Sequence, residues 1–392
     1  MKRLKSLELF AGAGGLSLGL HQAGFKHEAL VEWNSHAVKT LRLNCRSLLD
    51  IEAERVIEGD ARKYPLSEHD IGIDLLAGGP PCQPFSTSGK SLANLDHRDM
   101  FPCFLDAIRV LRPKSILIEN VKGLLRQRFR DYFEYILLAI QYPLATRGEK
   151  RFSDELQQLR RLDENSFREQ DRYRVTYQLI DTADYGVPQR RERVFITAFR
   201  ADLGVSPKHI TPTCSKESLL HDQFITGKYW ERHGIPSQKY LGHRDKRILS
   251  TLNQLEGINQ ELQLKAWETV RDTISGLPEA VPRGEEEEVA NHVQHPGARI
   301  YVGHIGSFHD YPAKALKAGT HGTPGGENML RVNNSDSVRY FTTREAARLH
   351  TFPDDWRFNG ETWGSSISQL GNAVPVKIGK MFGAYLYDSL TD

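Results

Sequence analysis

One stretch decides the fold: Leu7-Glu8-Leu9-Phe10-Ala11-Gly12-Ala13-Gly14-Gly15-Leu16. It predicts a buried strand that runs into a glycine-rich turn and then into a helix. The glycines let a ligand approach the backbone, and the N-terminus of the helix favours negative charge. Dehydrogenases use a related turn, but the spacing here is not G-x-G-x-x-G, which argues against a dinucleotide.

The alternation of strand and helix continues through the first third of the chain. Strands are expected at residues 7–10, 29–31, 56–57, 71–77 and 115–118, and helices at 16–23, 37–44 and 101–111. This βαβ pattern predicts an α/β fold with a parallel, doubly wound sheet. Ligands of such sheets bind beyond the carboxyl ends of the strands, so polar residues at those ends are the candidates for a site.

The rest of the chain predicts a second, smaller domain. With 392 residues the chain exceeds the usual size of one domain. Residues 142–172 are polar and charged and predict an exposed helical insertion, whereas strand patterns return at 175–180 and 194–199. Residues 203–339 lose the rhythm and predict loops and short strands. Helical periodicity at 343–349 and 374–388 predicts a return to the first core. The expected division is 1–200, 201–339 and 340–392.

Composition excludes several classes of protein. Hydrophobic residues make up 39% and charged residues 26% of the chain, as in water-soluble globular proteins. No apolar run is long enough to cross a bilayer, and no signal peptide is expected, so we predict a cytoplasmic protein without a membrane partner. The four cysteines are scattered without metal-ligand spacing, which argues against zinc and disulfides. The net charge of +2 does not by itself predict a nucleic-acid partner.

Three residues at successive strand ends suit an adenosine-type cofactor. Glu32 ends the second strand and could bind ribose hydroxyls, and Trp33 beside it could stack on a purine. Asp60 follows the third strand and could accept a hydrogen bond from an adenine amino group. Each acid alone could equally be a solvated loop residue. Their shared position favours the cofactor.

The stretch Gly78-Gly79-Pro80-Pro81-Cys82 places a cysteine on a stiff turn directly after a buried strand. Two glycines and two prolines restrict the backbone path and leave the thiol at its end. A reduced core cysteine is the ordinary alternative. The rigid surroundings favour a nucleophile instead.

Two further segments carry charges where a buried strand is expected. Glu119 ends the apolar run 116–118, where it could cap a helix or act as a proton donor in a low-dielectric pocket. Arg191 and Arg193 lie on the same face at the start of an apolar strand, either as surface ion pairs or to bind polar ring atoms. A thiolate, an acid and a cation together suit a pyrimidine. Carbon 5 of cytosine becomes reactive when a thiolate adds at carbon 6 and nitrogen 3 is protonated. Because the thiolate is the reactive form of a cysteine, we expect a nearby cation to lower the pKa of Cys82.

The chain resembles the cytosine-5 DNA methyltransferases of bacterial restriction-modification systems. Six motifs occur in the order of that family: residues 10–15, 80–83, 119–121, 189–193, 344–348 and 371–375. The resemblance implies a doubly wound, Rossmann-like methyltransferase sheet with a loop- and strand-rich target-recognition domain at 201–339. It also implies a monomer that acts on double-stranded DNA, paired functionally with a restriction endonuclease.

The resemblance also assigns roles to residues. Cys82 would be the nucleophile, Glu119 would engage nitrogen 3 and the exocyclic amine, and Arg193 the cytosine carbonyl. Arg191 would contact a flanking phosphate or steady Glu119. S-adenosylmethionine, without a metal, would be held by Phe10, Ala11, Gly12, Gly14, Gly15, Leu16, Glu32, Trp33, Asp60, Pro80, Asn372 and Val374. Arg344 and Arg348 are expected to be partly structural.

The family flips its target base out of the duplex, and residues 86–90, with Ser88, resemble the loop that closes over DNA. Residues 314–322 occupy the place where relatives carry Thr-Leu, but here Ala315 replaces the threonine, so no base-reading residue is assigned. Three alternatives remain open: a tRNA methyltransferase of the same family, a nicotinamide dehydrogenase, and a binding module without catalysis. The dehydrogenase leaves Cys82 without a role, and the intact Cys82, Glu119 and Arg193 argue against the module.

Overall fold

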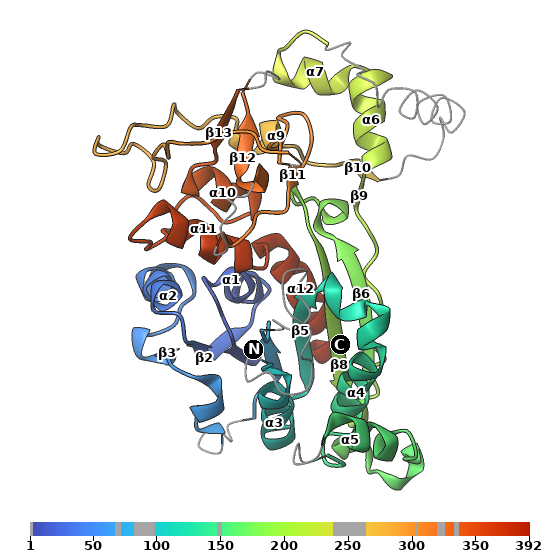
Figure 1. Cartoon of the computed structure of the whole chain (residues 1–392). Helices are drawn as coiled ribbons and strands as arrows, with labels where there is room; N and C mark the ends of the chain where they lie inside the picture. The colour runs from blue at the N-terminus through green and yellow to red at the C-terminus, as the bar shows by residue number, and fades with distance from the viewer. Residues whose placement is uncertain are drawn as a thin grey trace.

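A computed structural model describes residues 3–66, 72–81, 99–146, 151–237, 264–302, 304–319, 326–332 and 337–392 (Figure 1). Cys82 and residues 86–90 lie outside these ranges. The central sheet has seven strands in the order β3-β2-β1-β4-β5-β8-β6. Its strands are β1 (Lys5–Leu9), β2 (Lys26–Glu32), β3 (Val56–Glu58), β4 (Leu75–Gly78), β5 (Ser115–Val121), β6 (Tyr173–Asp181) and β8 (Glu192–Arg200).

The predicted α/β fold with a doubly wound sheet is confirmed, with one correction. Strands β1 to β5 are parallel, but β8 runs antiparallel to both β5 and β6. Only residues 182–191 connect β6 to β8, which is too short for the crossover that a parallel pair needs. The chain leaves β1 toward β2 and β3 on one side and returns as β4 on the other, so β1 and β4 form the switch point where a ligand can enter.

Helices cover both faces of the sheet because side chains alternate along the strands. Ile116 and Ile118 of β5 pack in the cluster that contains α3 (Phe101–Leu111) and α4 (Arg130–Gln141). Leu117 faces the other way, into the cluster of α1 (Gly15–Gln22) and α12 (Val376–Thr391). A third cluster joins α2 (Ser35–Leu48) to α10 (Thr343–Leu349) and α11 (Trp363–Asn372). The C-terminal helix thus packs against the first helix of the chain, as Figure 1 shows.

The contact between α1 and α12 leaves no room for a side chain at Gly19. A Cβ atom there would lie 2.4 Å from the backbone nitrogen of Lys380 and 2.6 Å from the carbonyl of Val376. We therefore expect Gly19→Ala to lower the free energy of unfolding by about 1–3 kcal/mol. This loss exceeds the gain of about 1 kcal/mol in helix propensity.

The matched control is Gly364→Ala in α11, where the nearest atom to an added Cβ is Thr362 Oγ1 at 3.8 Å. Urea unfolding should show this variant to be as stable as the wild type or slightly more stable. Equal stability of Gly19→Ala and the wild type would contradict the close packing of the two helices.

The region expected to be an exposed insertion is partly buried. Within it, α5 (Phe152–Leu159) packs against α4 and buries Leu156 and Leu159. Glu155, also buried, accepts a hydrogen bond from Tyr135 Oη at 2.8 Å. The region is helical and largely exposed, as expected, but two leucines three residues apart suffice to dock a helix of two turns, whatever the charge of its other face.

Residues 201–339 hold three described helices besides short strands. The helices are α6 (Lys216–Phe224), α7 (Lys228–His233) and α9 (Val270–Ile274). The strands are β9 (Cys214–Ser215) with β10 (Lys265–Ala266), β11 (Ala313–Lys314) with β7 (Gln189–Arg190), and β12 (Met329–Arg331) with β13 (Val338–Tyr340). The short strands agree with the sequence prediction. The helices were missed because none exceeds nine residues, too short for a clear periodicity.

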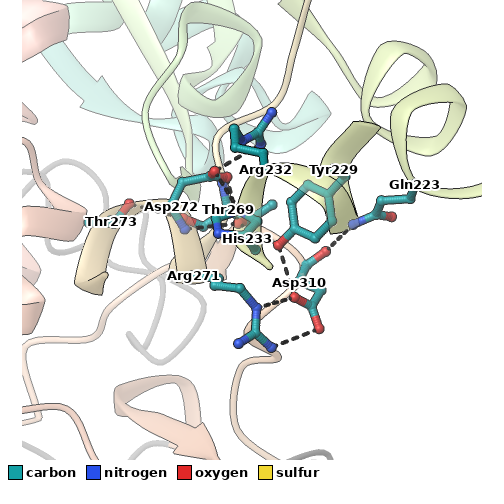
Figure 2. Close-up of polar contacts among 9 residues, drawn as sticks. All are labelled: Gln223, Tyr229, Arg232, His233, Thr269, Arg271, Asp272, Thr273 and Asp310. Atoms are coloured by element: carbon teal, nitrogen blue, oxygen red, sulfur yellow. Dashed lines mark hydrogen bonds and ion pairs between the residues drawn. The ribbon is translucent and has the colours of Figure 1, made fainter. Parts of the chain in front are cut away.

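A polar network connects α7, α9 and the loop around Asp310 (Figure 2). Tyr229 Oη donates to Asp310 Oδ1 at 2.9 Å, and the Arg271 guanidinium binds both oxygens of the same carboxylate. On the neighbouring turn, Asp272 accepts from Arg232 and His233, each at 2.9 Å. These charge-assisted bonds hold together a region whose apolar cluster is small. In the part of the chain that the structure describes, no helix has the length and apolar character needed to cross a membrane.

Candidate active site

A cleft of about 760 Å³ opens beyond the carboxyl ends of β1, β2, β4 and β5. Most of the predicted site residues that the structure describes line it together: Phe10, Gly12, Glu32, Trp33, Asp60, Pro80, Glu119, Arg191, Arg193 and Asn372. Phe10 has a φ of +60°, in the left-handed region that residues other than glycine rarely adopt. The turn after β1 is therefore strained at the edge of the cleft, as is common at binding sites.

Five predicted cofactor residues lie behind the cleft wall instead of lining it: Ala11, Gly14, Gly15, Leu16 and Val374. A Cβ on Gly15 would lie 2.1 Å from the carbonyl oxygen of Val374, so these two backbones are in contact. Gly14 has a φ of +87° and caps α1. These residues support the turn, and the contacts expected between them and the ligand stay a prediction.

Glu32 organises the first half of the cleft. Its Oε2 accepts the backbone N–H of Gly12 at 2.8 Å, and Oε1 accepts those of Trp33 and Asn34 at 3.0 and 2.8 Å. Burial raises the pKa of Glu32, while the three backbone N–H groups oppose this shift by stabilising the carboxylate. Oε2 accepts one hydrogen bond from the described residues, so a lone pair remains for a ligand hydroxyl.

Trp33 and Asp60 line the cleft together with Glu32, Trp33 as an exposed ring and Asp60 in an ion pair. The indole of Trp33 is 78% exposed and lines the cleft, so its face is available for stacking. Asp60 is held by Arg62, whose Nη2 lies 2.5 Å from Oδ2. This guanidinium lowers the pKa of Asp60. A ligand amino group would share the carboxylate with Arg62.

Glu119 and Arg193 meet in the second half of the cleft. Arg193 Nε lies 2.7 Å from Glu119 Oε1, and both side chains are largely buried. The two residues are neighbours across the antiparallel pair, where Val121 faces Arg193 and Glu119 faces Phe195. Gly79 leaves space for the carboxylate, since a Cβ there would lie 3.3 Å from Glu119 Oε2. Next to it, Asn120 Nδ2 donates to the carbonyl of Pro80 at 3.1 Å and fixes the turn that leads to Cys82.

Arg191, expected to contact a flanking phosphate or to steady Glu119, lies buried at the wall of the cleft. The residue is 2% exposed, and its guanidinium donates to the carbonyls of Leu316 at 3.3 Å and Gly371 at 2.7 Å. Burial lowers the pKa of Arg191 well below its usual range, and the neighbouring Arg193 adds to this. Its contacts connect parts of the chain that are far apart in sequence. Arg344 is likewise fully buried and donates to three backbone carbonyls, in line with a structural role.

The structure adds cleft residues that the sequence analysis missed. Among them are Asn34 and His36 and, from α11, Ser365, Ser368 and Gln369. Asn34 also caps α2 by accepting from Ala37 N at 3.1 Å. The only sequence signal for α11 is a capping box that begins at Thr362, because the helix itself is short and polar.

Glu8 is a buried acid beneath the cleft whose ionisation should affect stability. It is 1% exposed, its Oε2 has no partner among the described residues, and burial raises its pKa from 4.5 to about 8. Between about pH 5 and pH 8 the folded state therefore keeps a proton that the unfolded state releases, so this group lowers stability as the pH rises.

Glu8→Gln replaces the ionisable carboxyl group with an amide that does not titrate, and should increase the free energy of unfolding relative to the wild type. The difference should be small near pH 5 and largest near pH 8, as measured by urea unfolding at several pH values. Subtracting the wild-type curve removes the contribution of other titrating groups. A difference that does not depend on pH would refute the protonated state of Glu8.

The chain is similar to solved methyltransferase structures over its whole length. It matches a putative DNA modification methyltransferase encoded in an E. coli prophage with a TM-score of 0.61 and 18% identity, over 99% of this chain and 100% of that one. It matches S. pombe Dnmt2 methyltransferase with a TM-score of 0.56 and 18% identity, over 100% of both chains. The chain thus shares the Rossmann-like fold of these structures.

Sequence comparison identifies the family. Residues 4–141 and 157–386 match the family described as C-5 cytosine-specific DNA methylase, and the chain belongs to this family. It is 30% identical to the type II methyltransferase M.NgoMIV of Neisseria gonorrhoeae, over 98% of this chain and 97% of that protein. It is 32% identical to the type II methyltransferase M.Eco47II of Escherichia coli, over 95% of this chain and 76% of that protein. The expected resemblance and the expected enzyme class are both confirmed.

Proposed function

We propose that this enzyme uses S-adenosylmethionine to methylate carbon 5 of a cytosine within a specific sequence of double-stranded DNA. Its similarity to two type II methyltransferases supports a role in protecting DNA from a cognate restriction endonuclease. The single observation that carries the proposal is the shared cleft. One half presents Glu32 and Trp33, and the other half presents the Glu119–Arg193 pair.

The residues of the first half fit an adenosine cofactor. Gly12 has no atom within 4 Å of an added Cβ, so its backbone can be approached closely by a ligand. Glu32 would bind ribose hydroxyls, Trp33 would stack on the purine, and Asp60 would accept from its amino group. Asn372 and Pro80 would border the methyl-bearing end. When bound, the cofactor supplies a methyl group on a positively charged sulfur.

The residues of the second half suit the pyrimidine ring. Cys82 Sγ would form a bond to carbon 6 of the flipped cytosine, while Glu119 hydrogen-bonds nitrogen 3 and the amine. Arg193 would hold the carbonyl oxygen and keep Glu119 in place through the observed ion pair. This addition would make carbon 5 nucleophilic enough to accept a methyl group, whose bond to the sulfur of its donor would break as the new bond forms. Loss of the carbon 5 proton and departure of the thiolate then restore the aromatic ring.

Transfer of a tritiated methyl group to duplex DNA, compared with tRNA, tests the proposal. We expect label in the DNA alone, and bisulfite sequencing of DNA from cells that make the protein should show one methylated sequence. Label in tRNA alone would instead favour the RNA branch of the family. Binding of the duplex should weaken as salt rises, because cations contact its phosphates. A monomer with the division 1–200, 201–339 and 340–392 remains part of this proposal.

A further inference from the structure

A segment of residues 201–339, here called the second region, pairs with the short strand β7, which comes just before β8 of the central sheet. Strand β11 pairs in parallel with β7, with Ala313 opposite Gln189 and Lys314 opposite Arg190. The backbone N–H of Ala313 also donates to the carbonyl of Pro188 at 2.9 Å. Residues 313–318, which we call the docking segment, therefore lie against the strand that leads into β8.

In this segment, the backbone N–H and the carbonyl of Leu316 are both held by side chains of residues 189–191. Its N–H donates to Gln189 Oε1 at 3.1 Å, and its carbonyl accepts from Arg191 Nη1 at 3.3 Å. Gln189 is 0% and Arg191 2% exposed, so these hydrogen bonds are buried. Loss of either side chain would leave a buried backbone group unsatisfied, which is unfavourable by about 1–3 kcal/mol.

Arg191 also ties the docking segment to the wall of the cleft. Its Nη2 donates to the carbonyl of Gly371, a residue that lines the cleft together with Asn372. Gly371 in turn touches the docking segment, because a Cβ there would lie 2.3 Å from the backbone nitrogen of Ala318. One guanidinium thus spans two segments that meet in space.

The same short stretch of chain carries the arginine of the active site, because β8 begins at Glu192. Residues 189, 191 and 193 alternate along the chain, and their side chains bind Leu316, then Leu316 and Gly371, then Glu119. A shift of the docking segment would therefore be transmitted over only two residues to the Glu119–Arg193 pair. Buried polar networks of this kind hold one geometry because every alternative leaves a group unpaired.

We propose that Gln189 and Arg191 are positioning residues that fix the docking segment relative to Glu119 and Arg193. The target cytosine of a duplex held by the second region then reaches the reacting groups in one orientation. This inference rests on the roles proposed above for Glu119 and Arg193. In the proposed role, neither Gln189 nor Arg191 touches the substrate.

The test compares Gln189→Leu with a matched control, Gln178→Leu. Gln178 in β6 also holds a loop backbone, accepting from Ile210 N at 3.0 Å as Gln189 does from Leu316 N, and donating to Ile210 O at 2.8 Å. It does not line the cleft. Single-turnover methyl transfer is measured on a long unmethylated duplex of mixed sequence, at saturating DNA and cofactor.

We expect Gln189→Leu to lower the single-turnover rate roughly 10- to 100-fold, because small misplacements of reacting groups have effects of that size. The KM for the cofactor should not change, and the amide hydrogen of Leu316 should exchange faster with solvent. Gln178→Leu should keep the wild-type rate. Gln189→Glu, which keeps an acceptor for the N–H of Leu316, should recover most of the lost rate.

A wild-type rate in Gln189→Leu would overturn the inference, as would equal rate losses in Gln189→Leu and Gln178→Leu. A rate loss in Gln189→Leu that Gln189→Glu does not recover would also overturn it, since the acceptor would then be irrelevant. Each of these outcomes requires active wild-type enzyme. An inactive wild type would instead contradict the proposed function itself.

Discussion

Replacing Cys82 with alanine should abolish methyl transfer while DNA binding survives. Without a thiolate to add at carbon 6, carbon 5 of cytosine is too weak a nucleophile, and loss of an enzyme's nucleophile typically lowers the rate by on the order of 10⁴-fold or more. The residue just before it in the chain, Pro81, lines the cleft. The measurement is single-turnover transfer of a tritiated methyl group, with binding followed by fluorescence anisotropy.

The other cysteines provide the control. Burial raises the pKa of Cys103 to about 11 and also raises those of Cys45 and Cys214, so these three thiols are poor nucleophiles. Cys103→Ala should therefore leave the rate unchanged. A duplex with 5-fluorocytosine at the target should form a denaturation-resistant adduct with the wild type and with Cys103→Ala, because fluorine blocks the final elimination. An adduct formed by Cys82→Ala, or turnover by that variant, would rule out the mechanism.

The second large effect is expected for Glu119→Gln. The amide keeps the volume of the side chain but cannot exchange a proton with nitrogen 3, and removal of a general acid or base lowers the rate by about 10²- to 10⁴-fold. The substitution also removes the charge that Arg193 Nε binds at 2.7 Å. Because the two residues act as a pair, the double variant Glu119→Gln/Arg193→Gln should lose much less activity than the two single losses combined.

Glu192→Gln is the matched control for Glu119→Gln. Glu192 is the first residue of β8 and comes directly before Arg193. Its carboxylate pairs with Lys122 at 2.6 Å, and both side chains are about half exposed. Exposed ion pairs of this kind contribute about 0–1 kcal/mol, so the rate should hardly change. Full activity of Glu119→Gln, or independent losses in the double variant, would exclude the paired role.

Which residues meet in the half of the cleft proposed to hold the cofactor could be predicted from the sequence to a large extent. Glu32, Trp33 and Asp60 follow strands that the apolar runs define, and strand ends of a parallel sheet converge on one edge by geometry alone. The sequence did not show which glycine of the first turn can meet a ligand. Glycines in the first turn looked alike in sequence, but Gly12 faces open space whereas Gly14 and Gly15 pack against Leu41 and Val374. Which glycine meets a ligand depends on neighbours more than twenty residues away.

The amino-acid sequence by itself determined the class of sheet, the family and the residue types that carry the chemistry. These follow from short-range patterns: apolar runs of strand length, a glycine turn, and acids or arginines at fixed offsets from them. Only the tertiary structure decided that β8 runs antiparallel and that Arg193 reaches Glu119. It alone also turned Arg191 away from solvent toward Leu316 and Gly371. The physical reason is that a buried charged group takes whatever partners its surroundings leave unsatisfied, and those partners come from distant segments that only packing brings together.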